Sequence, residues 1–155
     1  RTPSRGSPFC RGRRLAVVRP SVGGVVETVL YVADVETAAA FYQHVLGLER
    51  LDGGESFAPM DAGGGTMLLL FLRGAPEEGT HFEGGWIPPH GGRGTSHVAL
   101  AIRSQDLEAW RAHLASEGVE IESEVQWERG GLSLYLRDPD GHSVELATPG
   151  IWPNY

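Results

Sequence analysis

The stretch VVETVLYVADVETAAAFYQHVLGLE, residues 25–49, decides the fold, because residues 95–120 repeat its pattern as TSHVALAIRSQDLEAWRAHLASEGVE. In each copy, alternating apolar residues predict a β-strand, and an apolar stripe with the period of a helix follows. Asp34 and Ser104 stand where the N-cap of each predicted helix is expected, because their side chains can accept a hydrogen bond from the first turn. Each copy therefore predicts a strand that leads into a capped helix.

Three short β-like runs follow each predicted helix. They cover about residues 48–52, 54–61, 65–72, 119–127, 131–138 and 142–148. We therefore predict an α+β fold in which two βαβββ repeats form a cupped mixed β-sheet, with the helices on its convex side.

The length of 155 residues fits one domain. We predict a basic, disordered N-terminal tail, a single domain at residues 24–150, and a short C-terminal tail. The predicted segments are 1–23 for the first tail, 24–72 and 95–148 for the two modules, 73–94 for the loop between them, and 151–155 for the second tail.

Composition excludes several classes of protein. The chain is 41% hydrophobic and has one cysteine, Cys10, which allows a packed core but excludes disulfide frameworks and cysteine-based zinc sites. All 13 basic residues are arginines, and six of them lie in the first 20 residues, so the remainder has 7 arginines against 20 acids. Such an acidic domain predicts no nucleic-acid partner. No apolar run approaches the roughly 18 residues of a membrane span, and we expect a cytoplasmic protein.

Strand alternation places three polar side chains away from the helix-packed face. Glu27 and His97 start the first strand of each copy, and overlaying the copies puts Glu27 on His97 and Leu69 on Glu145. A buried carboxylate or imidazole needs a partner or a ligand. Two copies related by a pseudo-twofold axis would bring Glu27, His97 and Glu145 together, and one imidazole with two carboxylates suits a divalent metal ion.

The paired repeat, the opening YVADVETAAAFYQHVLGLE at 31–49 and the ending LYLRDPDGHSVEL at 134–146 resemble the vicinal oxygen chelate superfamily. The resemblance covers about residues 24–150. It implies one divalent metal ion per site, with Fe, Mn, Ni, Co and Zn not distinguished. It also implies that Glu27, His97 and Glu145 are the metal ligands.

The resemblance implies glyoxalase-like lyase or isomerase chemistry, through a metal-bound enolate, on a small substrate that chelates through oxygen. Glu27 or Glu145 is then the candidate base. Leu69 takes the place of the fourth ligand of glyoxalase I enzymes. The first alternative is an extradiol dioxygenase, although residues 126–129 lack the histidine which that chemistry needs. The second alternative is a protein that binds a drug or metabolite without turnover, as bleomycin-resistance relatives do.

In the predicted strand at 131–138, alternation directs Ser133, Tyr135 and Arg137 toward the same face as Glu145. Tyr135 is a candidate catalytic residue that orients the substrate or donates a proton. Arg137 is predicted either to hold a substrate carboxylate or to pair with an acid on a neighbouring strand. Ser133 is a further predicted substrate contact.

The 23 residues at 73–95 contain seven glycines, three prolines and no periodic pattern. Loops of this length without secondary structure are usually lids or linkers. The apolar residues Phe82, Trp86 and Ile87 favour a lid over the cavity. We predict that Trp86 and His90 from this segment, with Phe71, contact the substrate.

The expected functional unit is a homodimer with shared sites. Each copy of the repeat supplies only half of a cupped sheet, and half a cup exposes its apolar concave face. The two halves can close within one chain or between two chains. We favour closure between chains, which would bring Glu27 of one subunit to His97 and Glu145 of the other.

Overall fold

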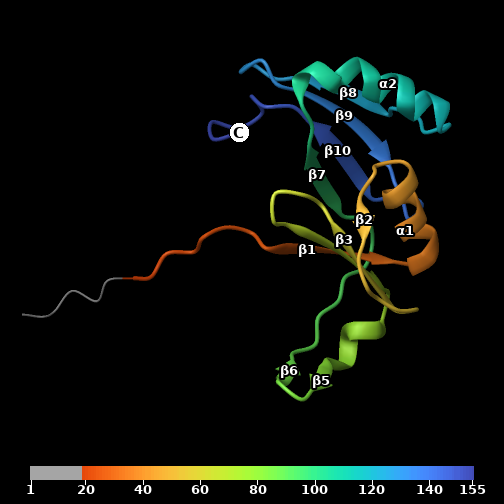
Figure 1. The fold of residues 1–155 in the computed structure, drawn as a ribbon, viewed down its shortest axis with the longest axis vertical. Helices are drawn as coiled ribbons and strands as arrows, with labels where there is room; N and C mark the ends of the chain where they lie inside the picture. Colours follow the sequence, from red (N-terminus) through yellow and green to blue (C-terminus); the bar gives the residue numbers. More distant parts are fainter. Residues whose placement is uncertain (1–18) are drawn as a thin grey trace, which may run out of the picture.

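A computed structural model describes residues 19–155, so the prediction for residues 1–18 lies outside the described part of the chain. Two groups of elements, each made of one principal helix and four strands, lie one above the other, and a small hairpin projects beyond the first group (Figure 1). This arrangement confirms the α+β fold with two βαβββ units.

The elements of the first module are β1 (Glu27–Val32), α1 (Val35–His44), β2 (Glu49–Arg50), β3 (Phe57–Asp61) and β4 (Met67–Leu72). Those of the second are β7 (His97–Ala101), η2 (Ser104–Asp106), α2 (Leu107–Ser116), β8 (Ser123–Gln126), β9 (Leu132–Arg137) and β10 (Ser143–Ala147). The two sheets have matching orders, β1-β4-β3-β2 and β7-β10-β9-β8. In each, the first and last strands of the module are parallel neighbours, so β1 and β7 are edge strands.

The two helices begin differently. Asp34 caps α1 as predicted, because its Oδ1 accepts a hydrogen bond of 2.7 Å from the backbone N–H of Thr37. Ser104 is not the N-cap of α2, and that prediction is wrong. A short 3-10 turn, η2, occupies residues 104–106, and α2 starts only at Leu107, with no side-chain cap. The Arg103–Asp106 ion pair of 2.6 Å spans this turn instead.

The connection between the modules has more structure than its composition predicts. It contains the 3-10 helix η1 (Ala75–Glu78) and an antiparallel hairpin of β5 (Thr80–Phe82) and β6 (Gly85–Ile87). The prediction of a structureless segment is therefore wrong. Gly74 and Gly79 flank η1 with positive φ angles, which glycine adopts without strain, and Pro76 occupies the first turn.

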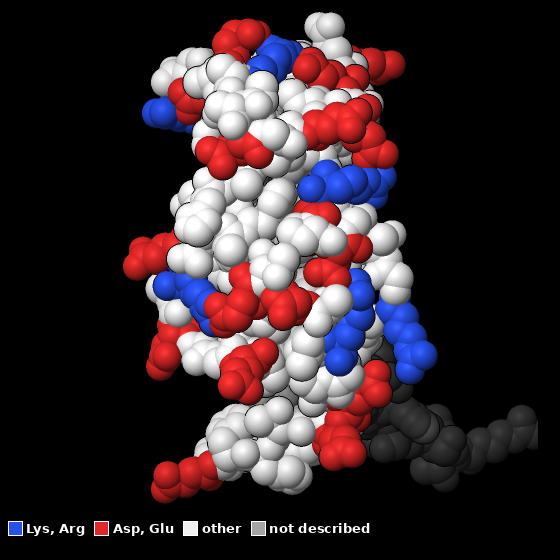
Figure 2. Space-filling view, turned by 90° about the vertical axis from the view of Figure 1, so that its right-hand side faces the viewer, with Lys and Arg blue, Asp and Glu red and all other residues white. Residues whose placement is uncertain are grey.

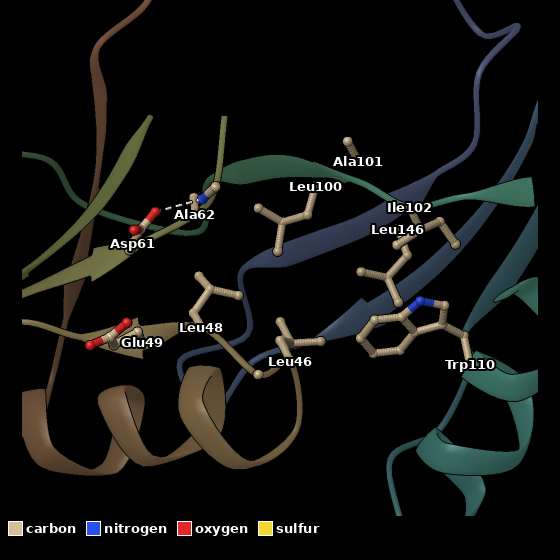
Figure 3. A pocket seen from close by; sticks show the side chains of 12 residues that line it. Leu46, Leu48, Glu49, Asp61, Ala62, Leu100, Ala101, Ile102, Trp110 and Leu146 are labelled. Carbon is tan, nitrogen blue, oxygen red and sulfur yellow. Dashed lines mark hydrogen bonds between the residues drawn. The ribbon is translucent and has the colours of Figure 1, made fainter. Parts of the chain in front are cut away.

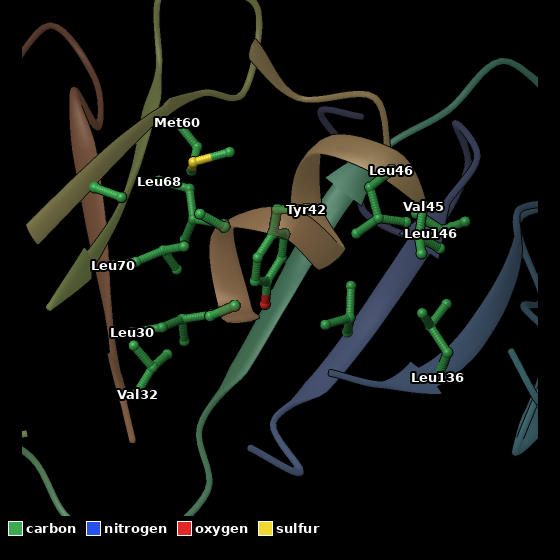
Figure 4. Close-up of a cluster of buried hydrophobic side chains, with 14 of the residues drawn as sticks. Leu30, Val32, Tyr42, Val45, Leu46, Met60, Leu68, Leu70, Leu136 and Leu146 are labelled. Atoms are coloured by element: carbon green, nitrogen blue, oxygen red, sulfur yellow. The ribbon is translucent and has the colours of Figure 1, made fainter. Parts of the chain in front are cut away.

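One hydrophobic core joins the two modules. Tyr42 of α1 lies between Leu30 and Leu70 of the first sheet and Leu136 and Leu146 of the second (Figure 4). All five side chains are essentially excluded from solvent. Burying an aliphatic side chain of this size contributes about 1.5–3 kcal/mol each, so α1 holds both sheets against itself.

A turn at residues 138–142, DPDGH, in which Asp138 and His142 are buried, adds polar contacts between the modules. The hydroxyl of Tyr42 donates to Oδ2 of Asp138 over 3.0 Å, while Oδ1 of Asp138 accepts from the backbone N–H groups of Asp140 and His142. Burial, followed by the nearby Asp138 carboxylate, raises the pKa of Tyr42 far above its ordinary value. Tyr42 therefore keeps its proton and acts as a donor at neutral pH.

The same turn reaches β1 and the strand ends. Oδ1 of Asp140 accepts from the backbone N–H of Ala33 over 2.7 Å and pairs with Arg73 over 2.8 Å. The backbone N–H of Ser96 donates to Nδ1 of His142 over 2.8 Å, so the ring carries its proton on Nε2 and donates to the carbonyl of Tyr31. His142 therefore serves as a structural bridge between the modules.

Charge on the surface is mixed and mainly acidic. On the face shown in Figure 2, acids outnumber arginines, and arginines stand beside acids instead of gathering into a basic patch. Arg50 pairs with Glu36, and Arg111 with Glu108 and Glu124. Among the described residues, no helix is both long and apolar enough to cross a membrane.

We predict that Tyr42→Phe lowers the free energy of unfolding by about 1–3 kcal/mol, because the buried Asp138 loses a donor while the ring still fills the core. Urea unfolding followed by circular dichroism measures the change. The matched control is Tyr155→Phe, which removes a hydroxyl bond to the carbonyl of Ala147 at a partly exposed position. A loss no larger in Tyr42→Phe than in Tyr155→Phe would contradict the assignment of Asp138 to the link between modules.

Candidate metal centre and substrate cavity

One face of the second sheet holds a histidine and a carboxylate in contact. Glu145 in the middle of β10 is buried, and its Oε2 lies 3.2 Å from Nε2 of His97 at the start of β7. The parallel register sets His97 beside Ser143, two residues before Glu145, so both side chains point to the same face. Strand alternation in the sequence predicts this placement.

Ser133 fixes the position of the Glu145 carboxylate. Its hydroxyl, fully buried, donates a short hydrogen bond to Oε1 of Glu145, and Nε1 of Trp127 donates to the same hydroxyl over 2.8 Å. Ser133 cannot donate to anything else while it holds Glu145, because a hydroxyl has one proton. The chain Trp127–Ser133–Glu145 therefore leaves Oε2 as the outward-facing oxygen.

His97 is oriented for ligation. Its Nδ1 lies 3.2 Å from both the backbone carbonyl and the hydroxyl of Ser143, so Nδ1 can either donate to the carbonyl or accept from the hydroxyl. The tautomer with Nδ1–H leaves the lone pair of Nε2 free beside Oε2 of Glu145. Two donor atoms 3.2 Å apart, each about 2.1 Å from one cation, would subtend roughly 100° at it, so this donor pair fits a divalent metal.

Glu27, the third predicted ligand, lies elsewhere in the chain. It starts β1 in the first sheet, is exposed, and lines a cavity of about 660 Å³ together with Val29 and Tyr31 of the same strand. In residues 19–155 no three His, Cys, Asp or Glu side chains come together as a metal site. A single chain therefore provides a pair, His97 and Glu145, and a separate carboxylate, Glu27.

The cavity beside Glu27 is mainly apolar. Its walls are formed by Val29, Phe57, Leu69, Phe71, Pro76 and Ile87. Two of the predicted substrate contacts lie together on one wall, where His90 packs edge-on against Phe71 with ring centroids 5.0 Å apart. Nδ1 of His90 also lies 2.7 Å from the hydroxyl of Tyr31, so the connecting segment places its histidine against β1 and β4.

The remaining predicted site residues occupy different surroundings. Tyr135, half-buried, stacks on His97 with ring centroids 6.1 Å apart. Arg137 is half-exposed and pairs with Glu122 on the segment before β8 over 2.6 Å, which is the cross-strand pairing that the sequence left open. Trp86 is 50% exposed and stacks on His81 within the hairpin. Of the predicted substrate contacts, only His90 and Phe71 line the cavity of the first module.

Sequence reasoning missed the roles of Trp127 and Tyr31. Trp127 precedes a glycine turn and is six residues from Ser133, so the hairpin of β8 and β9 folds it back onto that hydroxyl. Tyr31 shares the concave face with Glu27 by strand alternation, which was a usable signal. The position of its partner His90 could not be predicted in this way, because the connecting segment has no periodic sequence pattern.

Comparisons with known proteins agree with this architecture. The family model described as the Glyoxalase/Bleomycin resistance protein/Dioxygenase superfamily matches residues 24–146. The chain is 30% identical over 82% of its length to the metallothiol transferase FosB of Shouchella clausii, with 81% of that protein covered. A solved structure of lactoylglutathione lyase from Agrobacterium tumefaciens superposes with a TM-score of 0.77 at 29% identity, covering 86% of this chain and 99% of that one.

The phenol of Tyr135 reports on the carboxylate beside it. Burial, and after it the negative charge of Glu145, raises the pKa of Tyr135 above its ordinary value of 10.0, because a phenolate is disfavoured in both surroundings. We predict that Glu145→Gln lowers the pKa of Tyr135 toward that value, whereas Glu27→Gln does not. Ultraviolet titration against a Tyr135→Phe reference measures it. An unchanged pKa in Glu145→Gln would contradict the coupling of these two side chains.

Proposed function

Because the chain belongs to the glyoxalase/bleomycin resistance protein/dioxygenase superfamily, we propose that it is a divalent-metal-dependent enzyme of the glyoxalase type. The proposed chemistry is a lyase or isomerase reaction on a small substrate that offers two oxygens to the metal. The observation that carries this proposal is the pair of His97 and Glu145, with Nε2 and Oε2 3.2 Å apart on a concave sheet face.

The proposed ligands are His97 and Glu145 of one chain and Glu27 of a second chain. When bound, a divalent cation supplies a Lewis acid toward substrate oxygens. The supporting argument for a shared site is that each chain separates Glu27 from the other two residues, while the two modules have the same strand order. The resulting unit is a homodimer with two sites.

The two carboxylates are proposed to have different roles. Glu145 is 5% exposed and held by Ser133, so it is the fixed ligand. Glu27 is exposed, and among the described residues its carboxylate has no hydrogen-bond partner, so it is free to move. A general base must reach its proton and release it again, which favours Glu27 as the base.

The proposed substrate lies in the apolar cavity beside Glu27. The hydroxyl of Tyr31, which contacts His90, is a polar group in the lining of that cavity. Phe71 and Phe57 form an aromatic wall, with ring centroids 4.7 Å apart. Tyr135 beside His97 is proposed to orient the substrate from the second module. Burial of most of a small ligand in such a cavity keeps water from the reacting atoms.

Thiol transfer is a second candidate, which the 30% identity to a metallothiol transferase favours. Both candidates need the same metal centre, but they differ in products. The discriminating assay incubates the metal-loaded protein with the hemithioacetal of methylglyoxal and glutathione, and separately with a thiol and an epoxide. Thioester formation supports the lyase, and loss of free thiol with the epoxide supports the transferase. A protein whose ligand binds equally well after chelation of the metal would be a binding protein instead.

We predict that His97→Ala removes essentially all bound divalent metal while the fold remains, because His97 is half-exposed and outside the core. Metal content by mass spectrometry and far-ultraviolet circular dichroism measure both properties. The matched control is His81→Ala, on the exposed hairpin. Equal metal content in the two variants would refute His97 as a ligand.

Mixing two inactive variants tests the shared site. A Glu27→Ala chain and a His97→Ala chain should each bind no metal at the proposed shared site when studied alone. A mixed dimer keeps one site with Glu27 from one chain and His97 and Glu145 from the other, so we predict recovery of up to one metal ion per mixed dimer. Refolding the two chains together, followed by metal analysis, makes the measurement. Failure to recover any metal, with mixed dimers present, would contradict a site shared between two chains.

A further inference from the structure

We infer that Tyr31 and His90 together bind the end of the substrate that is remote from the metal, and that this end is an uncharged aromatic group with a hydroxyl or carbonyl oxygen. This role rests on the proposed function, because it takes the other end of the substrate to chelate a metal beside Glu27. It names the class of substrate that the cavity of the first module selects.

The cavity has two ends along β1. Glu27, Val29 and Tyr31 alternate onto one face of this strand, and all three line the cavity. Successive side chains on one face of a strand stand about 6.6 Å apart, so roughly 13 Å of strand separates Glu27 from Tyr31. A substrate that reaches from a metal beside Glu27 to the hydroxyl of Tyr31 therefore has room for one aromatic ring between its two ends.

His90 is held at the Tyr31 end by three contacts. Its Nδ1 lies 2.7 Å from the hydroxyl of Tyr31, its ring packs edge-on against Phe71, and its backbone N–H donates to the carbonyl of Pro76 over 3.2 Å. The backbone of Tyr31 is fixed in turn, because its carbonyl accepts a hydrogen bond from the ring of His142. The pair of Tyr31 and His90 is therefore a fixed part of the cavity wall.

Gly92 lets the connecting segment lie directly against the ring of Tyr31. A Cβ atom at position 92 would stand 2.6 Å from Cδ2 and 2.9 Å from Cε2 of that ring, which is closer than packed atoms approach. A Cβ atom at Gly91 would meet only the side chain of Glu77, at 3.4 Å or more. Neither glycine has a positive φ angle, so the close approach is what position 92 requires. Gly92 is therefore a positioning residue for His90.

The pair offers one hydrogen-bond donor to a ligand whichever tautomer His90 adopts. A neutral histidine and a phenol contribute one N–H and one O–H, and one of the two is used between them. If Tyr31 donates to Nδ1, the Nε2–H of His90 is left over, and if Nδ1–H donates to Tyr31, the phenol O–H is left over. Burial raises the pKa of Tyr31 above its ordinary value of 10.0, so the phenol keeps its proton at neutral pH. A substrate oxygen therefore finds a donor in both cases.

The walls between the two ends favour an uncharged aromatic group. The rings of Phe57 and Phe71, with centroids 4.7 Å apart, stand there beside the side chain of Leu69. Among the described residues that line this cavity, Glu27 is the one acid and no arginine is present. An anionic end of a substrate would be buried there without an arginine to pair with, which costs free energy, whereas a phenol or ketone oxygen needs only one donor.

The apolar cleft between the modules offers no such pair. Leu46, Leu48 and Trp110 lie along this cleft of about 340 Å³, and its charged groups are the carboxylates of Glu49 and Asp61 (Figure 3). The described residues that line it include no histidine and no tyrosine. A ligand with a phenol at its end is therefore expected in the cavity of the first module and not in this cleft.

Three hydroxamic acids test the class of substrate, because a hydroxamate offers two oxygens to a divalent metal. The probes are phenylpropanohydroxamic acid and its derivatives with a hydroxyl or a carboxylate at the para position of the ring. We expect the Zn²⁺-loaded protein at neutral pH to bind the hydroxyl probe about threefold to tenfold more tightly than the phenyl probe, which is the net effect of one hydrogen bond. The carboxylate probe should bind about tenfold or more weakly than the hydroxyl probe. Isothermal titration calorimetry measures all three.

A double substitution removes both donors and keeps both rings. In Tyr31→Phe with His90→Phe, the hydroxyl probe should bind no more tightly than the phenyl probe, while the affinity for the phenyl probe stays within about twofold of the original because the apolar cavity is intact. The control is Tyr155→Phe, which removes a tyrosine hydroxyl in the second module and should keep the preference. A preference for the hydroxyl probe that survives in the double variant would overturn the inference.

Two adjacent glycines provide a matched pair of variants. Gly92→Ala should reduce the preference for the hydroxyl probe, because the added methyl group forces the segment away from Tyr31 and moves His90 with it. Gly91→Ala should keep the preference, because its methyl group meets Glu77 at an ordinary contact distance. An equal preference in the two variants would contradict the positioning role of Gly92.

The same titrations separate this inference from the proposed function. Binding of the probes that is unchanged after Zn²⁺ is removed with a chelator would refute the proposed function. Binding that depends on Zn²⁺, but with equal affinity for the phenyl and hydroxyl probes or with the carboxylate probe bound most tightly, would overturn the role of Tyr31 and His90 and leave the metal site standing.

Discussion

The turn at residues 138–142 fixes how the two repeats sit against each other. Asp138 accepts a hydrogen bond from the hydroxyl of Tyr42, and Asp140 accepts one from the backbone N–H of Ala33. The ring of His142 makes hydrogen bonds to the backbones of both Ser96 and Tyr31. Every one of these bonds except the bond to Ser96 ends in the first module. Buried polar side chains such as Asp138 and His142 cost free energy unless they are paired, and no buried polar side-chain atom in the described residues lacks a partner. These hydrogen bonds therefore fix one relative arrangement of the two modules, in addition to the apolar contacts that hold them together.

The chemistry that we propose depends on this packing. With α1 clamped between the sheets, His97 and Glu145 share one concave face, and Glu27 stands at the cavity of the other module. Glu145 is held in place by Ser133 and Trp127, whereas Glu27 is exposed. In the proposed chemistry, the fixed pair of His97 and Glu145 holds the metal, and the movable carboxylate of Glu27 transfers the proton.

The sequence predicted those features that depend on local periodicity. The two βαβββ units, the Asp34 cap and the inward direction of His97 and Glu145 follow from alternation and capping chemistry alone. The start of α2 could not be predicted, because Arg103 and Asp106 favour a 3-10 turn that the Ser104 pattern does not reveal. The hairpin at 80–87 and the contact of His90 with Tyr31 were also missed, since both depend on tertiary packing of an aperiodic segment. The pairing of Arg137 with Glu122 was one of two open possibilities, which only the fold of β9 onto the preceding segment could decide.

Anomalous diffraction from a crystal grown with a divalent transition metal can show whether one metal site is built from two chains. We expect one anomalous peak per chain, about 2.0–2.3 Å from Nε2 of His97, a carboxylate oxygen of Glu145, and a carboxylate oxygen of Glu27 from a neighbouring copy. A peak at His97 and Glu145 with Glu27 of every copy far from it, or a peak bound by all three residues of a single chain, would contradict a site built from two chains.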